Sequence, residues 1–335
     1  MNAHSVSNNC ISGLLAVTHG SESIFAGKSE VVIAGGTESM SNPTLLYSPK
    51  GAEMFLKLSR ACSMGQKLSA LAGIRPGFCV PTAPSPTEPS TGLTMGQHME
   101  ITTKELSIPR DKQDELAFKS HQNAHKATEE GILTAEIAPL AGVDRDLIVR
   151  SSTTVEKLSS LKPVFDRSEK GTLTAGNSSA LTDGASAVLL MSETKANEQG
   201  REPLAFIKDY EYAAISPKDG LLMAPGVAVP RLLKRNELSF DDFDMIEIHE
   251  AFSAQVLANA KVWEEGWKED AIGSLNWDKV NMLGGSVALG HPFAATGGRI
   301  VTTMANHLKR NYWKRGLISI CAAGAMACAM ILERE

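Results

Sequence analysis

Residues 290–299, Gly-His-Pro-Phe-Ala-Ala-Thr-Gly-Gly-Arg, form a glycine-rich turn that opens the part of the chain deciding the fold. An amphipathic helix with Met304 and Leu308 on its apolar side follows, and then an apolar strand over residues 317–320. Proline suits the first turn of a helix, and glycine permits the close approach of a ligand. The stretch therefore predicts an α/β unit with His291 at the start of its helix, although such a turn can also be purely structural.

The same order of elements is found near the start of the chain. Cys10 stands before a helix that is expected from Gly13 onward, and a buried strand over residues 31–34 follows that helix. A helix N-terminus offers free backbone N–H groups and a dipole that favours negative charge, so the pKa of the Cys10 thiol is expected to be lowered. The repeated order predicts a duplicated α/β unit with a reactive residue, Cys10 or His291, at each helix start.

The remaining apolar segments predict further strands, separated by helical or polar sequence. These strands are expected at residues 187–191, 205–208, 245–248 and 326–332. The alternation favours an α/β fold with mixed, mostly parallel sheets, and the strands at residues 317–320 and 326–332 are expected to form a hairpin. Prolines interrupt the long middle segment, which predicts an inserted loop subdomain. The expected organisation is an N-terminal half over residues 1–40 and 175–200, an insertion over 41–174, and a C-terminal half over 201–335.

The composition is that of an ordinary globular protein. The 335 residues are 43% hydrophobic and 21% charged with a formal net charge of -5, which argues against nucleic-acid binding. A membrane-spanning helix needs about 20 consecutive apolar residues, and the sequence contains no such run. The five cysteines form no CxxC pair, which favours a reducing compartment. The expected location is the bacterial cytoplasm, or the mitochondrion if a transit peptide preceded the first residue.

Two further motifs carry candidate catalytic residues. His249 begins a His-Glu-Ala-Phe motif directly after the strand at residues 245–248, where side chains commonly face an active-site crevice. The residues that follow do not complete an HExxH motif, and no other metal-ligand spacing is present, so no metal is expected. Cys321 ends a strand and could act as a general acid or base. Each of these residues, like Cys10, could instead be packed in the core.

Taken in order along the chain, these motifs resemble the thiolase family. The resemblance rests on residues 7–13, 34–41, 175–179, 249–252, 290–292 and Cys321, which together span nearly the whole chain. The His-Glu-Ala-Phe form and residues 63–66 and 321–324 are most similar to the β-subunit of the trifunctional fatty-acid-oxidation complex. The resemblance implies the thiolase fold and an acyltransferase that cleaves 3-ketoacyl-CoA to acetyl-CoA and a shortened acyl-CoA.

The resemblance also implies catalytic roles. Cys10 would take the acyl group as a thioester, His291 would activate Cys10, and Cys321 would move the proton at the α-carbon. His249, where many thiolases have asparagine, would position the water of an oxyanion hole. Backbone N–H groups at Cys10 and near Ala323 would form a second oxyanion hole.

Coenzyme A would be a co-substrate, and no permanently bound cofactor is implied. The resemblance places Ser179 along the pantetheine, Arg150 near the adenine and phosphate groups, and Met95, Met223 and Phe252 against the thioester end. The alternatives for these residues are a solvated surface charge, a turn cap and core packing.

Partners can also be expected from the resemblance. The family is usually at least dimeric, so a homodimer or larger oligomer is expected, with CoA thioesters as ligands and a fatty-acid-oxidation α-subunit as a further candidate partner. Residues 50–75 carry five basic residues and interspersed apolar ones. This pattern is compatible with membrane or subunit contact, but also with a solvated helix face.

Two departures from the family pattern keep other functions open. Only nine residues precede Cys10, where the family has an opening strand–helix–strand region, so an N-terminal truncation is expected. Ala294, Ala325 and Ala327 replace usual glycines, and alanine is strained wherever that glycine has a positive φ. The alternatives are therefore a biosynthetic acetoacetyl-CoA thiolase, or a catalytically impaired thiolase-like partner subunit or fragment.

Overall fold

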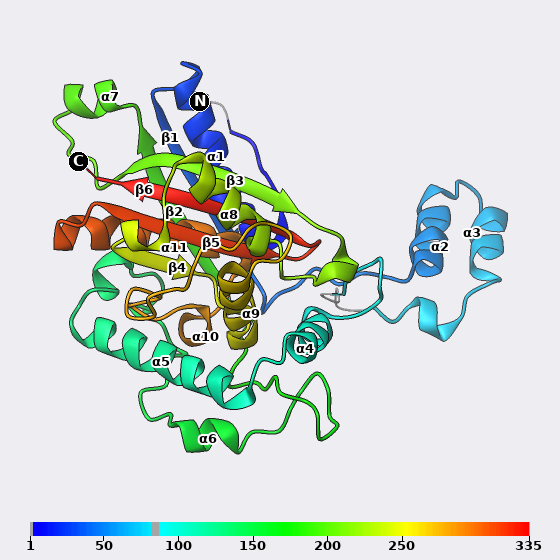
Figure 1. Cartoon of the computed structure of the whole chain (residues 1–335). Coiled ribbons are helices and arrows are strands. Elements are labelled where there is room, and N and C mark those ends of the chain that lie inside the picture. Colours follow the sequence, from blue (N-terminus) through cyan, green and yellow to red (C-terminus); the bar gives the residue numbers. More distant parts are fainter. Residues whose placement is uncertain (1–2, 82–86, 335) are drawn as a thin grey trace.

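The structure is a computed structural model that describes residues 3–81 and 87–334. A two-stranded sheet contains β1 (Val31–Glu38) and β2 (Gly184–Met191). A four-stranded sheet has the order β3-β6-β5-β4, with β3 (Phe206–Ala214), β4 (Met245–Ile248), β5 (Arg315–Ala322) and β6 (Met326–Glu333). Figure 1 shows both sheets in the body of the molecule, with helices packed around them. Within the described residues, no helix is both long and apolar enough to cross a membrane.

The strand directions correct one expectation. Among the described strands, β4 and β5 pair in parallel, whereas β1 with β2, β3 with β6 and β5 with β6 pair antiparallel. The predicted hairpin of the last two strands is confirmed, but the prediction of mostly parallel strands is wrong. Apolar periodicity reveals that a segment is a strand, and it carries no information on the direction of the neighbour.

Two helices fill the space between the sheets. α1 (Ser12–Phe25) and α11 (Phe293–Asn311) share one apolar cluster with Ala34 of β1 and with Ile318 and Ile320 of β5. Leu317, next to Ile318 along the strand, points to the other face of the sheet, where α8 (Pro225–Arg235) and α9 (Ser253–Glu265) pack. Successive side chains of a strand alternate between its faces, so β5 contributes to both cores.

The starts of α1 and α11 meet with their backbones in contact. A Cβ atom on Gly13 would lie 2.5 Å from the carbonyl oxygen of Ala294. Cβ atoms on Gly36 and Gly297 would overlap the Ala294 carbonyl and the backbone of Leu14. Glycine is therefore required here for close approach, and it brings the two predicted reactive helix starts together.

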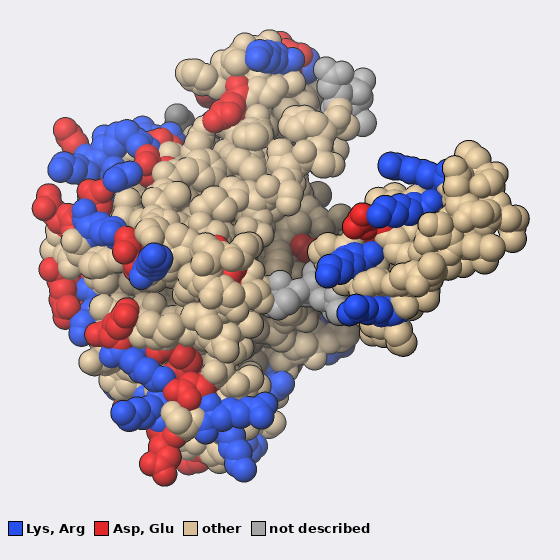
Figure 2. Space-filling model, turned by 90° about the vertical axis from the view of Figure 1, so that its right-hand side faces the viewer, with Lys and Arg blue, Asp and Glu red and all other residues tan. Residues whose placement is uncertain are grey.

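The middle of the chain is mostly helical. Its helices are α2 (Pro49–Arg60), α3 (Met64–Leu71), α4 (Met95–Glu105), α5 (Arg110–Glu129) and α6 (Val155–Ser159), and the short α7 (Glu193–Glu198) and α10 (Ser286–Leu289) lie further along. Figure 1 shows α2 and α3 on an arm that projects away from the body. Figure 2 shows Lys and Arg side chains gathered along one side of this arm. The predicted boundaries between the insertion and the two halves stay a prediction.

The three alanines that replace usual family glycines differ in backbone conformation. Ala325 has φ 57 in the turn between β5 and β6, directly after Gly324 with φ 83. Ala294 lies in α11 and Ala327 in β6, and neither has a positive φ. The strain expected at these positions is therefore confined to Ala325.

Ala325→Gly is expected to raise the free energy of unfolding by up to about 1 kcal/mol, because glycine adopts the left-handed region without the Cβ clash. Urea denaturation checks this value. Ala327→Gly is the matched control, and it should destabilise the protein because glycine in a strand interior costs roughly 0.5–1 kcal/mol. Equal losses from both changes would contradict a strained Ala325.

Candidate active site

Cys10 is held by contacts from both ends of the chain. It lies in a short 3-10 turn, η1 (Asn9–Ile11), that runs directly into α1. The hydroxyl of Ser12 donates to the carbonyl oxygen of Asn9 at 2.7 Å. Asn9 has φ 49, and its side-chain amide donates to the carbonyl oxygen of Ala323 at 3.1 Å. Asparagine tolerates this left-handed conformation, so the turn is fixed against the β5–β6 turn with little strain.

The pKa of the Cys10 thiol is raised, not lowered. Burial raises the pKa to about 11, while the backbone hydrogen bonds at Ala323 and at Cys10 itself lower it and the charge of Glu38 adds to the rise. The prediction of a low thiol pKa is therefore wrong, because the loss of hydration outweighs the helix-start N–H groups. Cys10 is a neutral thiol near pH 7 and needs a base to become a nucleophile.

Two buried histidines lie beside the thiol. One ligand atom each from Cys10, His249 and His291 lie within 4.8 Å of one another, and the two imidazole centroids are 4.1 Å apart. Burial lowers the pKa of His291 to about 3 and that of His249 well below its usual value, and the charge of Arg299 acts in the same direction. Both rings are therefore neutral near pH 7. A neutral imidazole next to a neutral thiol can accept its proton.

The same three side chains are close enough to hold a metal ion. Cysteine and histidine are ligands that suit zinc. The spacing of the three residues along the chain does not predict such a site, because they lie on η1, after β4 and before α11.

Cys321 completes the group of predicted catalytic residues. It is the next-to-last residue of β5, it is buried, and it shares an apolar cluster with Met223 and Phe252. Burial raises the pKa of the Cys321 thiol well above its usual value, and the neighbouring Cys10 adds to the rise. The carboxyl ends of two parallel strands and the starts of two helices thus bring all four residues to one place.

The structure also positions the residues predicted to contact CoA. Met95 packs against the cluster of Met223, Phe252 and Cys321. The backbone N–H of Ser179 donates to the carbonyl oxygen of Ala251 at 3.0 Å, so Ser179 lies beside the His-Glu-Ala-Phe segment.

Arg150 lies beside His121. It is exposed, and its backbone N–H donates to Nδ1 of His121 in α5 at 3.2 Å. Among the described residues, no hydrogen bond or ion pair joins it to the cysteine–histidine group. The role of Arg150 in binding CoA stays a prediction.

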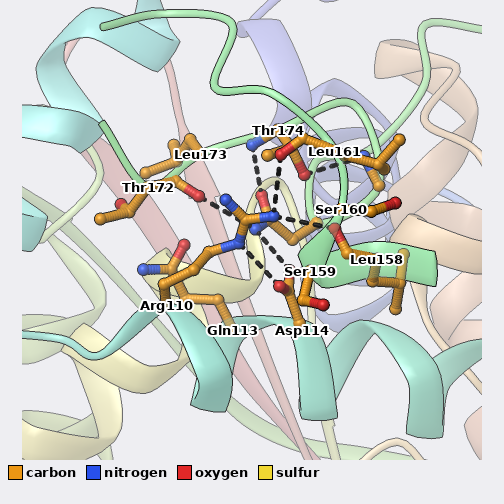
Figure 3. A network of polar contacts seen from close by, with 12 residues as sticks. Arg110, Gln113, Asp114, Leu158, Ser159, Ser160, Leu161, Thr172, Leu173 and Thr174 are labelled. Carbon is orange, nitrogen blue, oxygen red and sulfur yellow. Dashed lines mark hydrogen bonds and ion pairs between the residues drawn. The ribbon is translucent and has the colours of Figure 1, made fainter. Parts of the chain in front are cut away.

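An ion pair between a half-buried arginine and a buried aspartate supports the loop that leads to Ser179. Arg110 pairs with Asp114 at 2.7 Å, and Asp114 accepts a hydrogen bond from the amide of Asn177 at 3.0 Å. Figure 3 shows the Arg110 side chain extended from α5 between Asp114 and the backbone of Leu158 and Leu161. These contacts join α5, α6 and the loop of residues 172–177, and they fix the position of one wall of the site.

Sequence reasoning assigned no role to a second group of polar residues behind His249. Nδ1 of His249 lies 2.8 Å from the hydroxyl oxygen of Ser286, which also accepts from Arg299 at 3.3 Å. The carboxylate of Glu250 accepts from the Asn281 amide at 2.6 Å and from the hydroxyl of Ser120 at 2.7 Å. The one sequence feature that could have indicated Ser286 is its position directly after the glycine pair at residues 284–285.

Glu247 carries a strongly shifted pKa next to this group. Burial raises the pKa of its carboxyl from the usual 4.5 to about 8, Glu250 and Glu136 add to the rise, and Arg299 at 4.0 Å opposes it. The folded protein therefore holds this proton between pH 4.5 and about 8, where the unfolded chain has lost it. The contribution to stability is complete below pH 4.5 and is lost as the pH rises through about 8.

Glu247→Gln is expected to remove the loss of stability that ionisation of Glu247 causes. Between pH 4.5 and about 8, the free energy of unfolding of the variant should therefore fall less than that of the wild type. Urea denaturation at a series of pH values measures the difference. Glu169→Gln, a change at an exposed carboxylate, should follow the wild type. Parallel profiles for wild type and Glu247→Gln would show that the carboxyl is ionised throughout.

Two sheets packed with helices bring a buried cysteine and two buried histidines together, an arrangement that suits an enzyme that uses a cysteine nucleophile. Two family models cover almost all of the chain: "Thiolase, N-terminal domain" matches residues 1–194, and "Thiolase, C-terminal domain" matches residues 201–334. The chain belongs to the thiolase family.

Named relatives agree with this assignment. The chain is 41% identical over 346 residues to the 3-ketoacyl-CoA thiolase of Colwellia psychrerythraea, a match that covers 99% of this chain and 79% of that protein. It is 40% identical over 342 residues to the human mitochondrial trifunctional enzyme subunit beta, with 99% of this chain and 72% of that protein covered. The resemblance expected from the motifs is confirmed.

Solved structures confirm the thiolase fold. The Bacillus anthracis acetyl-CoA acetyltransferase matches with a TM-score of 0.80 at 33% identity, covering 98% of this chain and 78% of that one. The human mitochondrial 3-ketoacyl-CoA thiolase in complex with CoA matches with a TM-score of 0.80 at 29% identity, covering 98% and 76%.

Proposed function

We propose that this protein is an acyl-CoA C-acyltransferase that cleaves 3-ketoacyl-CoA with CoA into acetyl-CoA and a shortened acyl-CoA. The observation that carries the proposal is the buried group of Cys10, His249 and His291, whose ligand atoms lie within 4.8 Å of one another. Cys321 next to this group supplies a second thiol for proton transfer. Relatives named 3-ketoacyl-CoA thiolase support the direction of the reaction.

The geometry supports a reaction in two halves. In the first, His291 takes the proton of Cys10, and the thiolate attacks the C3 carbonyl carbon of the substrate. The bond between C2 and C3 then breaks, the thiol of Cys321 protonates C2, and acetyl-CoA leaves while the acyl group stays on Cys10 as a thioester. The negative charge on the C3 oxygen is stabilised by the backbone N–H groups at Cys10 and near Ala323. The charge that develops on the thioester oxygen as the C2–C3 bond breaks is stabilised by a second set of hydrogen-bond donors, which includes His249.

In the second half, the Cys321 thiolate takes the proton of an incoming CoA thiol. The CoA sulfur attacks the thioester carbon, Cys10 leaves as a thiolate and recovers its proton from His291, and the shortened acyl-CoA is released. Atoms and protons balance over the two halves, and neither needs a further reactant. The neutral state of both cysteines and both histidines in the resting enzyme matches this cycle.

CoA is the proposed co-substrate. The apolar cluster of Met95, Met223 and Phe252 next to Cys321 suits the thioester end, and Ser179 beside it suits the pantetheine. A matching structure holds CoA, which supports the proposal. We propose Arg150 for the phosphate end on its charge and exposure alone.

A relative named trifunctional enzyme subunit beta supports a fatty-acid-oxidation α-subunit as the partner, in an assembly that is at least dimeric. The arm of α2 and α3 is the proposed contact, because basic residues and exposed apolar ones such as Phe55, Leu56 and Leu68 lie on it. Membrane contact through the arm stays a prediction.

A thiolysis assay with 3-ketoacyl-CoA substrates of increasing chain length, in the presence of CoA, tests the proposed function. Loss of the 3-ketoacyl-CoA absorbance and appearance of acetyl-CoA are expected. A protein that is folded by circular dichroism and gives no turnover with any chain length would support a catalytically impaired partner subunit. Condensation of acetyl-CoA in clear preference to cleavage would support the biosynthetic alternative.

A further inference from the structure

The hydrogen bonds behind His249 define which of its ring nitrogens carries the proton. The hydroxyl oxygen of Ser286 lies 2.8 Å from Nδ1 of His249 and 3.3 Å from a guanidinium nitrogen of Arg299. Arginine is only a donor, so its N–H points at the serine oxygen and the serine proton is free for another acceptor. Among the described residues, Nδ1 of His249 is the acceptor that this hydroxyl faces. The Nδ1 atom therefore accepts, and the proton of the neutral ring is on Nε2.

The hydrogen bonds behind His291 have the opposite sense. Its Nδ1 lies 2.7 Å from the hydroxyl oxygen of Thr296, and that hydroxyl donates to the carbonyl oxygen of Pro292 at 3.1 Å. A carbonyl can only accept, so the Thr296 proton is used there and Nδ1 of His291 donates to the threonine oxygen. The Nε2 atom of His291 keeps its lone pair and can accept the proton of Cys10.

Both Nε2 atoms are buried, and within the described residues neither has a hydrogen-bond partner in the protein. Two rings with centroids 4.1 Å apart thus present opposite functions toward the reaction space, a donor on His249 and an acceptor on His291. A lone pair on Nε2 of His249 would instead face the developing negative oxygen and repel it.

We propose that Ser286, oriented by Arg299, is a positioning residue that holds His249 in its Nε2–H tautomer so that His249 donates a hydrogen bond to the substrate oxygen in the transition state. The proposal rests on the proposed thiolase function for its kinetic consequence. Its structural part, the tautomer itself, does not depend on turnover. Ser286 suits this position because it begins α10, directly after the glycine pair, and is fully buried.

The kinetic test compares Ser286→Ala with Ser286→Thr, which keeps the hydroxyl. Ser286→Ala should lower kcat about tenfold with little change in KM for 3-ketoacyl-CoA, less than the 10²–10³ expected for deletion of an oxyanion donor. Ser286→Thr should recover most of that loss. In a His249→Asn background, Ser286→Ala should cost no further activity, because the residue it orients is gone. The same loss in both backgrounds would overturn the proposal, because it would show a general structural role.

The tautomer is read directly from the ring ¹⁵N shifts of histidine-labelled enzyme, with His249 assigned by the loss of its signals in His249→Asn. The wild type should show a protonated Nε2 and an unprotonated Nδ1, and Ser286→Ala should show a mixture of both tautomers. A wild-type ring with its proton on Nδ1 would overturn the proposal whatever the kinetics. Absence of thiolysis together with the expected tautomer would reject the proposed function and leave the orienting role of Ser286 in place.

Discussion

Cys10→Ala is expected to abolish the acyl adduct and to lower the rate of thiolysis on the order of 10⁴-fold or more, because removal of a nucleophile removes the whole covalent route. Intact mass spectrometry after incubation with acetyl-CoA measures the adduct, which should appear on the wild type as an added acetyl group. The thiol is buried against Ala323 and beside two neutral histidines, so its loss leaves no neighbouring group of equal reactivity apart from Cys321.

Cys62→Ala is the matched control. Cys62 is exposed at the start of the arm's second helix and should leave both the adduct and the rate unchanged. An acetyl adduct that persists in Cys10→Ala would show that another side chain is the nucleophile. Peptide mapping of that adduct would then identify the residue.

His291→Asn is expected to change the pH dependence of acylation as well as its rate. In the wild type the pKa of His291 is lowered to about 3, so the base form is present across pH 6–8 and the rate should be nearly constant there. Without the base, attack depends on the small thiolate fraction of Cys10, whose pKa is raised to about 11. The rate should then fall by roughly 10³-fold at pH 7 and rise about tenfold per pH unit.

Acylation by acetyl-CoA, followed by rapid quenching and mass spectrometry at several pH values, measures this profile. His19→Asn, a change at an exposed histidine of α1, should keep the flat profile of the wild type. A flat profile in His291→Asn would show that another group takes the proton of Cys10, and His249 would be the next candidate because its ring lies beside that of His291.

The sequence predicted the elements of the fold better than their directions. The strand expected at residues 245–248 is β4 with the same bounds, and the hairpin of β5 and β6 is confirmed. These segments are apolar, short and bounded by polar residues, which is a local property. The direction of β3 beside β6 depends on how a long intervening chain returns, and local patterns do not contain that information.

At the candidate site, too, the sequence predicted local features and missed those that depend on residues distant in the chain. The structure brings together Cys10, His249, His291 and Cys321, all of which were selected because they follow strands or begin helices. The pKa of Cys10 could not be derived from its sequence position, because burial by residues distant in the sequence outweighs the local helix start. The contact of Ser286 with His249 could not be predicted either, because the two residues are 37 positions apart in the sequence.

The glycine contacts at the starts of α1 and α11 bear on the stiffness of the reaction centre. A Cβ on Gly13 would lie 2.5 Å from the Ala294 carbonyl, so backbone meets backbone between the turn that carries Cys10 and the helix that follows His291. Such a contact has no rotamers through which it can loosen. Folding therefore completes the alignment of sulfur and imidazole before any substrate arrives, and little reorganisation of the protein remains for the chemical step. One added methyl group at Gly13 would separate the sulfur of Cys10 from the imidazole of His291 without touching either of them.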